Sequence, residues 1–418
     1  MKKMNMRLAG LFLAATVSTI AGALDAQNNT AAADENIIAS ERPAGALRSK
    51  QSLNNMSMTI ESVIALAKEQ SPEAIQAKHT FRASYWQNRT YKANFLPSLV
   101  LTSTLPNFSR ATTAVQQPDG SYQYQRDYSN RMSAGLNLEQ GVPFTGGRLT
   151  FGSSLSRTDI FGDNEYVQYM STPLSVTYSQ SIFGINEFKW EKKIEPLRFE
   201  EAKKRYLFAM ENVSLVAIRY FFNLAEAQQR VAVAEFNSAN NEELYKIARG
   251  RYNIGTIGEN EMLQSELNFM NANATLNDAL LTLANAKNRL RSFLGFNESV
   301  DISILIPLEA PGVQLDVERI TELAKQNNPN LVAYQRQLIE AQKNVASAKA
   351  SRGFSADLYM QFGLDRSSGS PKKSGTLSDV YNNLNDMERV QLGLRIPILD
   401  WGKGKGRVKM AESNEELV

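Results

Sequence analysis

The most constraining feature of this sequence is one helical stretch too long for a compact domain. Between Glu187 and Tyr252 the only proline is Pro196, in the first turns. At 1.5 Å per residue, roughly 65 helical residues reach about 100 Å. Apolar and small residues recur at intervals of three and four residues, as in a coiled coil, and polar residues occupy the other faces of the helix. The expected inward-facing residues are Phe199, Ala202, Tyr206, Ala209, Val213, Val216, Tyr220, Leu224, Ala227, Val231 and Ala234.

A turn and a second helix follow. The turn spans residues 253–258, where Gly255 and Gly258 allow the backbone angles of a tight reversal. The second helix is expected from Glu259 to Leu294, with regularly spaced leucines. Because such a hairpin has no globular core, it must pack against copies of itself or against partners. Acidic residues on these helices are interpreted as solvated.

The chain also repeats itself. Residues 60–72 and 317–329 share Glu, Leu-Ala-Lys and Pro in register. A helical stretch follows each copy, at 73–93 and 330–350, and each then gives way to strand-like sequence. Chance similarity of two helices is the alternative, but the shared order of helix, proline, helix and strand favours a duplication.

Several segments alternate apolar and polar residues with period two, the pattern of a sheet with unlike faces. Segments of about ten residues of this kind are typical of a transmembrane barrel, although one half-buried strand of a soluble protein looks the same. The first half offers four such strands and the second two, and it stays open which of the four enter a membrane. The polar stretches 109–130 and 365–388 are expected to be long external loops. The alternating segments are 99–105, 134–139, 149–155, 174–182, 356–364 and 390–396.

The N-terminus sets the expected compartment. A basic start and a short apolar run, residues 8–23, predict a secretory signal peptide over 1–26; a membrane anchor is the weaker alternative. No later stretch approaches the roughly 20 apolar residues of a spanning helix, so membrane insertion would use β-strands. The sequence has no cysteine, hence no disulfide and no lipid on a cysteine. A formal net charge of +3 predicts no nucleic-acid partner.

Composition and motifs speak against an enzyme. The single histidine, His79, lies in the middle of a helical stretch, and without cysteine neither a zinc site nor a histidine-based triad can be assembled. The glycines and lysines of 402–406 lack phosphate-loop spacing, and Arg407 stands where Ser or Thr would follow. We expect no catalytic residue, no metal and no cofactor.

Two motifs carry a family resemblance. One runs from Arg251-Tyr252 through Gly255, the leucines 263 and 267, Asn271-Ala272 and Leu290 to Leu294-Gly295. The other is residues 396–403, Ile-Pro-Ile-Leu-Asp-Trp-Gly-Lys. Together they resemble the TolC-type outer membrane efflux family (outer membrane factors), from residue 59 onward. The first half departs from the pattern by having Ser181 where the second has Pro397.

The resemblance implies an internally duplicated, mixed α+β membrane protein. Long helical coiled-coil hairpins would form a tunnel, and each subunit would add four strands to a trimeric barrel of about 12. The implied function is the outer-membrane channel of a tripartite efflux pump or type I secretion system, with export passive through the duct. Implied partners are two further copies, a periplasmic adaptor, an inner-membrane pump or ABC transporter, and outer-membrane lipid. A soluble periplasmic adaptor or scaffold without a pore is the alternative.

The resemblance also suggests sites. The tip residues Gly255, Thr256, Ile257, Gly258, Glu259 and Asn260 are expected to dock the adaptor, although the glycines are equally well explained as shaping the turn. Pro97, Ser181 and Pro397 are expected to mark the transitions between barrel and helix.

The expected organisation is a signal peptide (1–26), a flexible segment (27–57), a first repeat (58–295), a linker (296–315) and a second repeat (316–418). The second repeat is expected to be truncated, because no helical hairpin follows its last strand before Val418. The residues that close the channel entrance would lie in that missing hairpin.

Overall fold

The computed structural model describes residues 56–116, 118–162, 165–296, 301–306, 312, 316–370 and 372–418. The expected signal peptide, nearly all of the flexible segment and most of the linker therefore lie outside the described residues. The chain divides into two compact units, Met1–Met56 with Glu298–Ser303, and Ser57–Asn297 with Ile304–Val418. Apart from the short strands β1 (Met56–Met58) and β6 (Ile302–Ile304), the elements belong to the second unit.

The duplication is visible in the helices. In the first half α2 (Ile60–Gln70) leads into α3 (Pro72–Ala93), and in the second α6 (Val317–Asn327) leads into α7 (Pro329–Arg352). The single residue between each pair caps the second helix: the Ser71 hydroxyl accepts from the Ala74 amide at 3.1 Å, and the Asn328 side chain from the Asn330 amide at 2.9 Å. Each cap is followed by proline at the first helical position, where no amide donor is needed.

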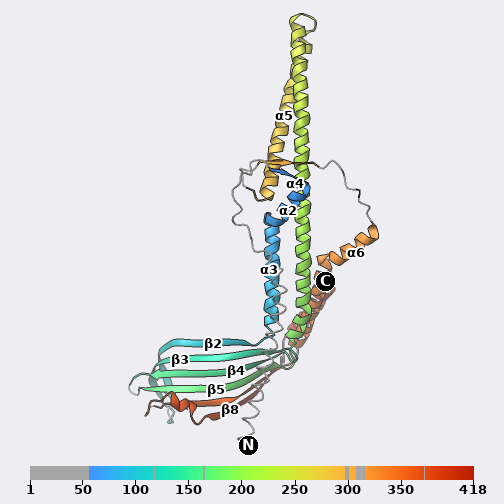
Figure 1. The fold of residues 1–418 in the computed structure, drawn as a ribbon. Coiled ribbons are helices and arrows are strands. Elements are labelled where there is room, and N and C mark those ends of the chain that lie inside the picture. The colour runs from blue at the N-terminus through green and yellow to red at the C-terminus, as the bar shows by residue number, and fades with distance from the viewer. Residues whose placement is uncertain are drawn as a thin grey trace. The chain divides into compact units, whose positions relative to one another are not determined.

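The predicted long hairpin is present. Helix α4 (Glu187–Asn253) has 67 residues and contains Pro196, and α5 (Glu259–Phe293) has 35. Helix α5 lies along the last part of α4, whereas α2, α3 and α7 pack against α4 elsewhere (Figure 1). No helix among the described residues is long and apolar enough to cross a membrane.

The predicted seam of α4 is buried in its middle and half-buried at its start, where the rings of Phe199 and Tyr206 pack against Phe81 of α3. Val213, Leu224, Ala227, Val231 and Ala234 are buried as expected. Nearer the N-terminus, the buried residues include Ile194, Glu195 and Glu201, while Phe199 and Ala202 are half-buried. The burial of Glu195 and Glu201, which was not predicted, is accompanied by ion pairs with arginines. Phe221, which was not predicted, is fully buried.

All six predicted strands form one sheet, in the order β2-β3-β4-β5-β7-β8, and every neighbouring pair is antiparallel (Figure 1). The sheet has two more strands than the four that the family resemblance implies. Helix α8 (Lys403–Leu417) follows the last strand. The strands are β2 (Ser98–Gln116), β3 (Tyr122–Val142), β4 (Gly147–Ile160), β5 (Tyr166–Ser181), β7 (Ser355–Ser368) and β8 (Asn385–Arg395).

The prediction of a long loop over 109–130 is wrong. Strands β2 and β3 continue through it in register until Gln116 faces Tyr122. Threonine and tyrosine favour strands, and the strong turn signal, Pro118-Asp119-Gly120, comes only at the far end. The second predicted loop, 365–388, is shortened by both strands and contains the 3-10 helix η1 (Ser378–Tyr381).

Candidate functional site: a two-faced sheet and a helical tip

One face of the sheet carries a continuous apolar belt. The strand register places Leu138 opposite both Leu99 and Phe151, and continues the row through Val176 to Phe362. Residues directly opposite each other in antiparallel strands share a face. On β8 this row meets Glu388, and the belt reaches that strand through the neighbouring pairs Met360–Val390 and Leu358–Leu392. We call these residues the apolar belt: Leu99, Leu101, Leu136, Leu138, Leu149, Phe151, Leu174, Val176, Leu358, Met360, Phe362, Val390, Leu392 and Leu394.

No belt residue is buried in the single chain: those on the two edge strands are exposed, and those on the central strands are exposed or half-buried. Leu101 on β2 is 70% exposed and Val390 on β8 is 64% exposed. Soluble monomers rarely leave so extended an apolar surface open to water. The belt therefore requires an apolar surrounding.

The opposite face is polar and rich in small residues. Glu139 and Arg148 form an ion pair at 3.7 Å, and the Ser175 hydroxyl donates to the Gly152 carbonyl at 3.2 Å. Such a face is suited to lining a water-filled interior. Its residues include Thr102, Asn137, Glu139, Thr150, Gly152, Ser175, Thr177, Gln361, Gly363, Gln391 and Gly393.

Aromatic rings lie at both ends of the belt. At one end, the Tyr128 ring centroid is 5.1 Å from that of Phe108 and 4.9 Å from that of Phe161. At the other end, the Phe183 and Phe354 centroids are 4.5 Å apart. Aromatic side chains at the two margins of an apolar band are typical of proteins in contact with membrane interfaces.

The predicted transition residues lie at the helix-proximal end of the sheet. Pro97 directly precedes β2, Ser181 is the last residue of β5, and Pro397 stands two residues after β8. Ser181 faces Asp357 in the neighbouring strand, and the amide of Ile182 donates to the Ala356 carbonyl at 2.8 Å. The strand pairing thus continues to the point where the chain turns toward α4.

The turn between β3 and β4 is fixed at the same end. The Asn186 side chain donates to the Pro143 carbonyl at 2.8 Å and accepts from the Lys189 amide at 3.2 Å, so it holds the turn and caps α4. The Tyr178 hydroxyl donates to the Thr145 hydroxyl at 3.0 Å. Asn186 was not among the predicted site residues, although an Asn directly before a long helix is a recognisable capping signal.

The tip of the α4–α5 hairpin is built by a Schellman motif. The Thr256 amide donates to the Arg251 carbonyl at 3.0 Å, and the Gly255 amide to the Tyr252 carbonyl at 2.9 Å. Gly255 has φ +68°, a conformation that favours glycine, whereas Gly258 caps α5 with an ordinary φ of −79°. Only one of the two glycines is thus required by the reversal, contrary to the prediction. Ile257 is half-buried, and the other five residues of the expected docking set are exposed: Gly255, Thr256, Gly258, Glu259 and Asn260.

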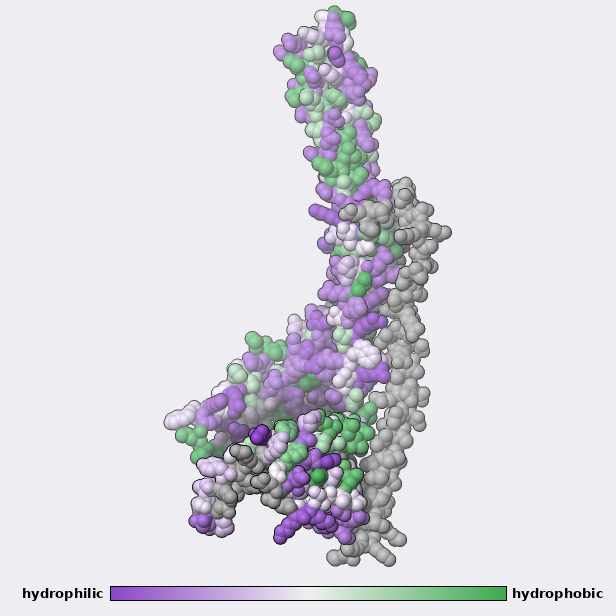
Figure 2. Space-filling view, turned by 90° about the vertical axis from the view of Figure 1, so that its left-hand side faces the viewer, coloured by the Kyte–Doolittle hydropathy of each residue, from purple (hydrophilic) through white to green (hydrophobic). Residues whose placement is uncertain are grey.

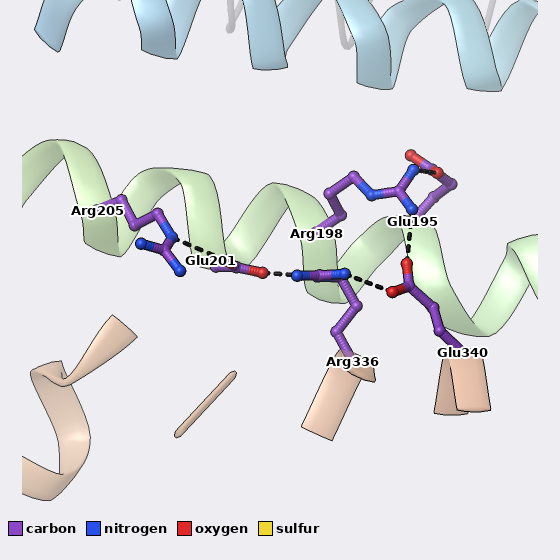
Figure 3. A network of polar contacts seen from close by, with 6 residues as sticks. All are labelled: Glu195, Arg198, Glu201, Arg205, Arg336 and Glu340. Atoms are coloured by element: carbon purple, nitrogen blue, oxygen red, sulfur yellow. Dashed lines mark hydrogen bonds and ion pairs between the residues drawn. The ribbon is translucent and has the colours of Figure 1, made fainter. Parts of the chain in front are cut away.

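A charged network joins α4 to α7, as Figure 3 shows. Glu201 accepts hydrogen bonds from Arg205 at 2.7 Å and Arg336 at 2.6 Å, and Arg336 also pairs with Glu340 at 2.6 Å. Glu340 in turn accepts from Arg198 at 2.7 Å, and Arg198 pairs with Glu195. The interpretation of all helical carboxylates as solvated is therefore wrong for this network.

The network shifts the acidity of Glu201. Burial by itself raises the pKa of this carboxyl, but the hydrogen bonds from Arg336 and Arg205 outweigh it and hold the pKa below the usual value. Glu201 is therefore charged at neutral pH and ties the two halves of the chain together.

Both helices of the hairpin carry a further apolar stripe on exposed faces. On α4, Phe208, Leu215 and Phe222 follow one another at intervals of seven residues. Hydrophobic residues interrupt the hydrophilic surface along this arm in Figure 2. A stripe with heptad spacing is typical of helices that pack against further helices. Other exposed members are Phe236, Leu244 and Ile247 on α4 and Leu263, Leu267, Met270 and Leu281 on α5.

Backbone amides of the glycine-rich segment 402–406 are hydrogen-bonded within the chain itself. Asp400 accepts from the Gly402 amide at 2.9 Å and the Gly404 amide at 2.8 Å, and these hydrogen bonds lower the pKa of its carboxyl. These amides are thus already paired. His79 is exposed on α3, and the described part of the chain contains no group of three metal-ligating side chains.

Known proteins share this sequence pattern and fold. Residues 147–296 match the model of the family described as outer membrane efflux protein. The probable outer membrane lipoprotein SilC of Salmonella typhimurium is 22% identical over 284 residues, 67% of this chain and 56% of that protein. The matched region thus spans little more than half the length of that relative.

Solved outer-membrane channels superpose on nearly the whole chain. The outer membrane channel CmeC of Campylobacter jejuni is 18% identical with a TM-score of 0.58, covering 90% of this chain and 71% of that structure. CusC, studied for its transmembrane channel formation, is 15% identical with a TM-score of 0.57, covering 89% and 73%. The predicted resemblance and the predicted mixed fold of long helices and strands are confirmed, and both solved proteins are described as channels.

Proposed function

We propose that this chain, which has the fold of the outer membrane efflux proteins and matches their family over residues 147–296, is one subunit of a trimeric outer-membrane channel. Its sheet supplies part of a membrane barrel, and its long hairpin supplies part of a periplasmic duct. Export through the duct is passive, and an inner-membrane pump or ABC transporter provides energy and selects the cargo.

The two faces of the sheet carry this proposal. An apolar belt crosses six strands with aromatic rings at both ends, and a polar face lies opposite. A sheet with these faces is stable where lipid covers one side and water the other. Because β2 and β8 each have one hydrogen-bonded neighbour among the described strands, the sheet leaves two edges to be paired. Unpaired edges do not persist in lipid, which supports a barrel shared between copies.

The helices support the same assembly. The heptad-spaced stripe of Phe208, Leu215 and Phe222 lies outside the core of the single chain. Packing copies side by side would bury the stripe and close a tube of helices. A periplasmic adaptor docks on the tip, residues 255–260, where every residue except Ile257 is exposed.

The alternative, a soluble periplasmic adaptor, would account for the hairpin alone. It leaves the exposed belt and its aromatic margins without a role. The six-stranded sheet therefore favours the channel.

Fractionation of cells that produce the protein tests the proposal. The protein should stay with outer membranes, require detergent for extraction and then sediment as three copies. Loss of the protein should sensitise cells to exported compounds, and crosslinkers placed at Thr256 should capture a periplasmic partner. A protein that dissolves without detergent and sediments as a monomer would overturn the proposal.

A further inference from the structure

The two repeats differ in their strands. The second repeat runs from α7 through β7 and β8 to α8, whereas the first runs from α3 through β2, β3, β4 and β5 to α4. Relative to the second repeat, the first contains one additional hairpin, β3–β4, between its first and last strands. The question is whether this hairpin belongs to the membrane wall.

The hairpin is fully integrated in the sheet. Pairing with β2 runs from Ser98 opposite Glu139 to Gln116 opposite Tyr122, and β4 pairs with β5 from Arg148 opposite Ser179 to Ile160 opposite Tyr166. The hairpin thus spans the sheet from end to end and separates β2 from β5.

The hairpin also has the two faces of the wall. Leu136, Leu138 and Phe151 continue the apolar belt, and Asn137 and Thr150 continue the polar face. Its turn is held at the helix-proximal end by the Asn186 side chain. A hairpin folded over an opening or lying outside the membrane would not need a belt in register with that of its neighbours.

The two free edges are complementary. Because all neighbours in a sheet of six strands are antiparallel, β2 and β8 run in opposite directions. The edge of β8 can therefore pair antiparallel with the edge of β2 from another copy. The only proline within β2, Pro106, falls at the register shift between Thr104 and Asn107, a position where an edge strand tolerates a missing donor.

We infer that all six strands of each copy enter the membrane barrel and that β8 of one copy pairs with β2 of the next. Three copies of six strands then close a barrel of 18 strands instead of the 12 that four strands per copy would give. Barrel diameter grows roughly linearly with strand number, so the lumen is about one and a half times as wide. The duct thus accepts bulkier cargo at its outer end. This inference rests on the proposed trimeric channel.

The first arm of the test is crosslinking between copies. The sequence has no cysteine, so any disulfide that forms must join cysteines that were introduced. Six double variants combine one cysteine on β2 with one on β8. The β2 positions are Leu99→Cys and Leu101→Cys, and the β8 positions are Val390→Cys, Leu392→Cys and Leu394→Cys. Several pairs are needed because the experiment must also determine the register between copies. Oxidation of the whole protein in its membrane should give covalent dimers and trimers for at least one pair. The pair Leu358→Cys and Leu392→Cys, opposite each other within one chain, is the control for oxidation.

The second arm asks what the β3–β4 hairpin faces. Leu138→Cys should react with a lipid-soluble thiol reagent and resist a membrane-impermeant one. Asn137→Cys, the adjacent residue on the polar face, should show the reverse preference in channels open to the reagent. Val176→Cys and Thr177→Cys provide the matching comparison on β5, the strand that leads into α4. Val176 lies in the apolar belt and Thr177 on the polar face.

The outcomes separate the inference from the function. Crosslinked trimers with Leu138→Cys in lipid support an 18-stranded barrel. Crosslinked trimers with Leu138→Cys open to water overturn the inference and leave the channel in place. A formed control disulfide without any product between copies overturns both.

Discussion

Glu201 on α4 accepts a hydrogen bond at 2.6 Å from Arg336 on α7, a residue 135 positions away in the other repeat. The Glu201 side chain is only 8% exposed and that of Arg336 only 16%. Partners this well shielded from water interact more strongly than the exposed pairs along the same helix. The two repeats are thus joined by a charged contact as well as by apolar packing.

Replacing Glu201 by Gln should weaken this junction. Hydrogen bonds to charged groups contribute about 1.5–3 kcal/mol, and the variant should lose a similar free energy of unfolding in its helical part. Glu226→Gln is the matched control, because Glu226 pairs with Arg230 at 2.7 Å on the same helix but is 63% exposed. Its cost should be about 0.3–0.5 kcal/mol. Equal shifts of the two urea midpoints, followed by far-ultraviolet circular dichroism, would contradict the account.

The same contact predicts an acid-sensitive junction. The pKa of Glu201 is lower in the folded chain than its ordinary value of 4.5, so the folded state gains stability from the ionised form above that value. This contribution is lost as the pH falls below about 4.5 toward the folded pKa. The thermal midpoint of the Glu201→Gln variant should therefore depend less on pH in this range than that of the native protein. Parallel pH profiles would assign the acid sensitivity to other carboxylates.

Adjacent positions on β5 should respond oppositely to a charge. Val176 lies in the apolar belt and Thr177 on the polar face. Arginine on the lipid face near the middle of a barrel costs about 2–4 kcal/mol, so Val176→Arg should strongly reduce folding into lipid vesicles. Thr177→Arg should fold nearly normally, because its side chain faces water. Similar unfolding free energies for the two variants would show that lipid does not cover the belt.

The two tip glycines should differ in their tolerance of a side chain. Gly255 has φ +68°, where a β-branched residue is strained by roughly 1–2 kcal/mol. Gly255→Val should therefore speed hydrogen exchange of the Thr256 amide about 5- to 30-fold, since that amide is bonded across the turn. Gly258→Val should leave exchange nearly unchanged, because Gly258 has φ −79° and no heavy atom near its added Cβ. Equal protection in both variants would mean that Gly255 is not what holds the turn.

Local signals predicted the helices well. Gly255, which was placed in the turn after α4, lies within a few residues of the helix end it defines. Asn186 before α4 was not predicted, although it is a capping signal of the same local kind. The Ser71-Pro72 and Asn328-Pro329 pairs likewise mark breaks between helices. These features depend on neighbours in sequence, so the residues alone reveal them.

Contacts between distant residues were harder to predict. The outer halves of β2 and β3 are too polar to show alternation, and they were mistaken for a loop because only their mutual pairing identifies them as strands. Glu201 resembled a solvated residue because its partner belongs to the other repeat. That β3 and β4 belong to the same sheet as β2 and β5 likewise became clear only from their register.

The most direct test of the central claim is imaging of the membrane-extracted protein by electron microscopy. The account predicts three copies around one central barrel, with β8 of each copy beside β2 of the next and six strands from every copy in the wall. A particle in which one copy closes its own barrel, or one without a central pore, would contradict it.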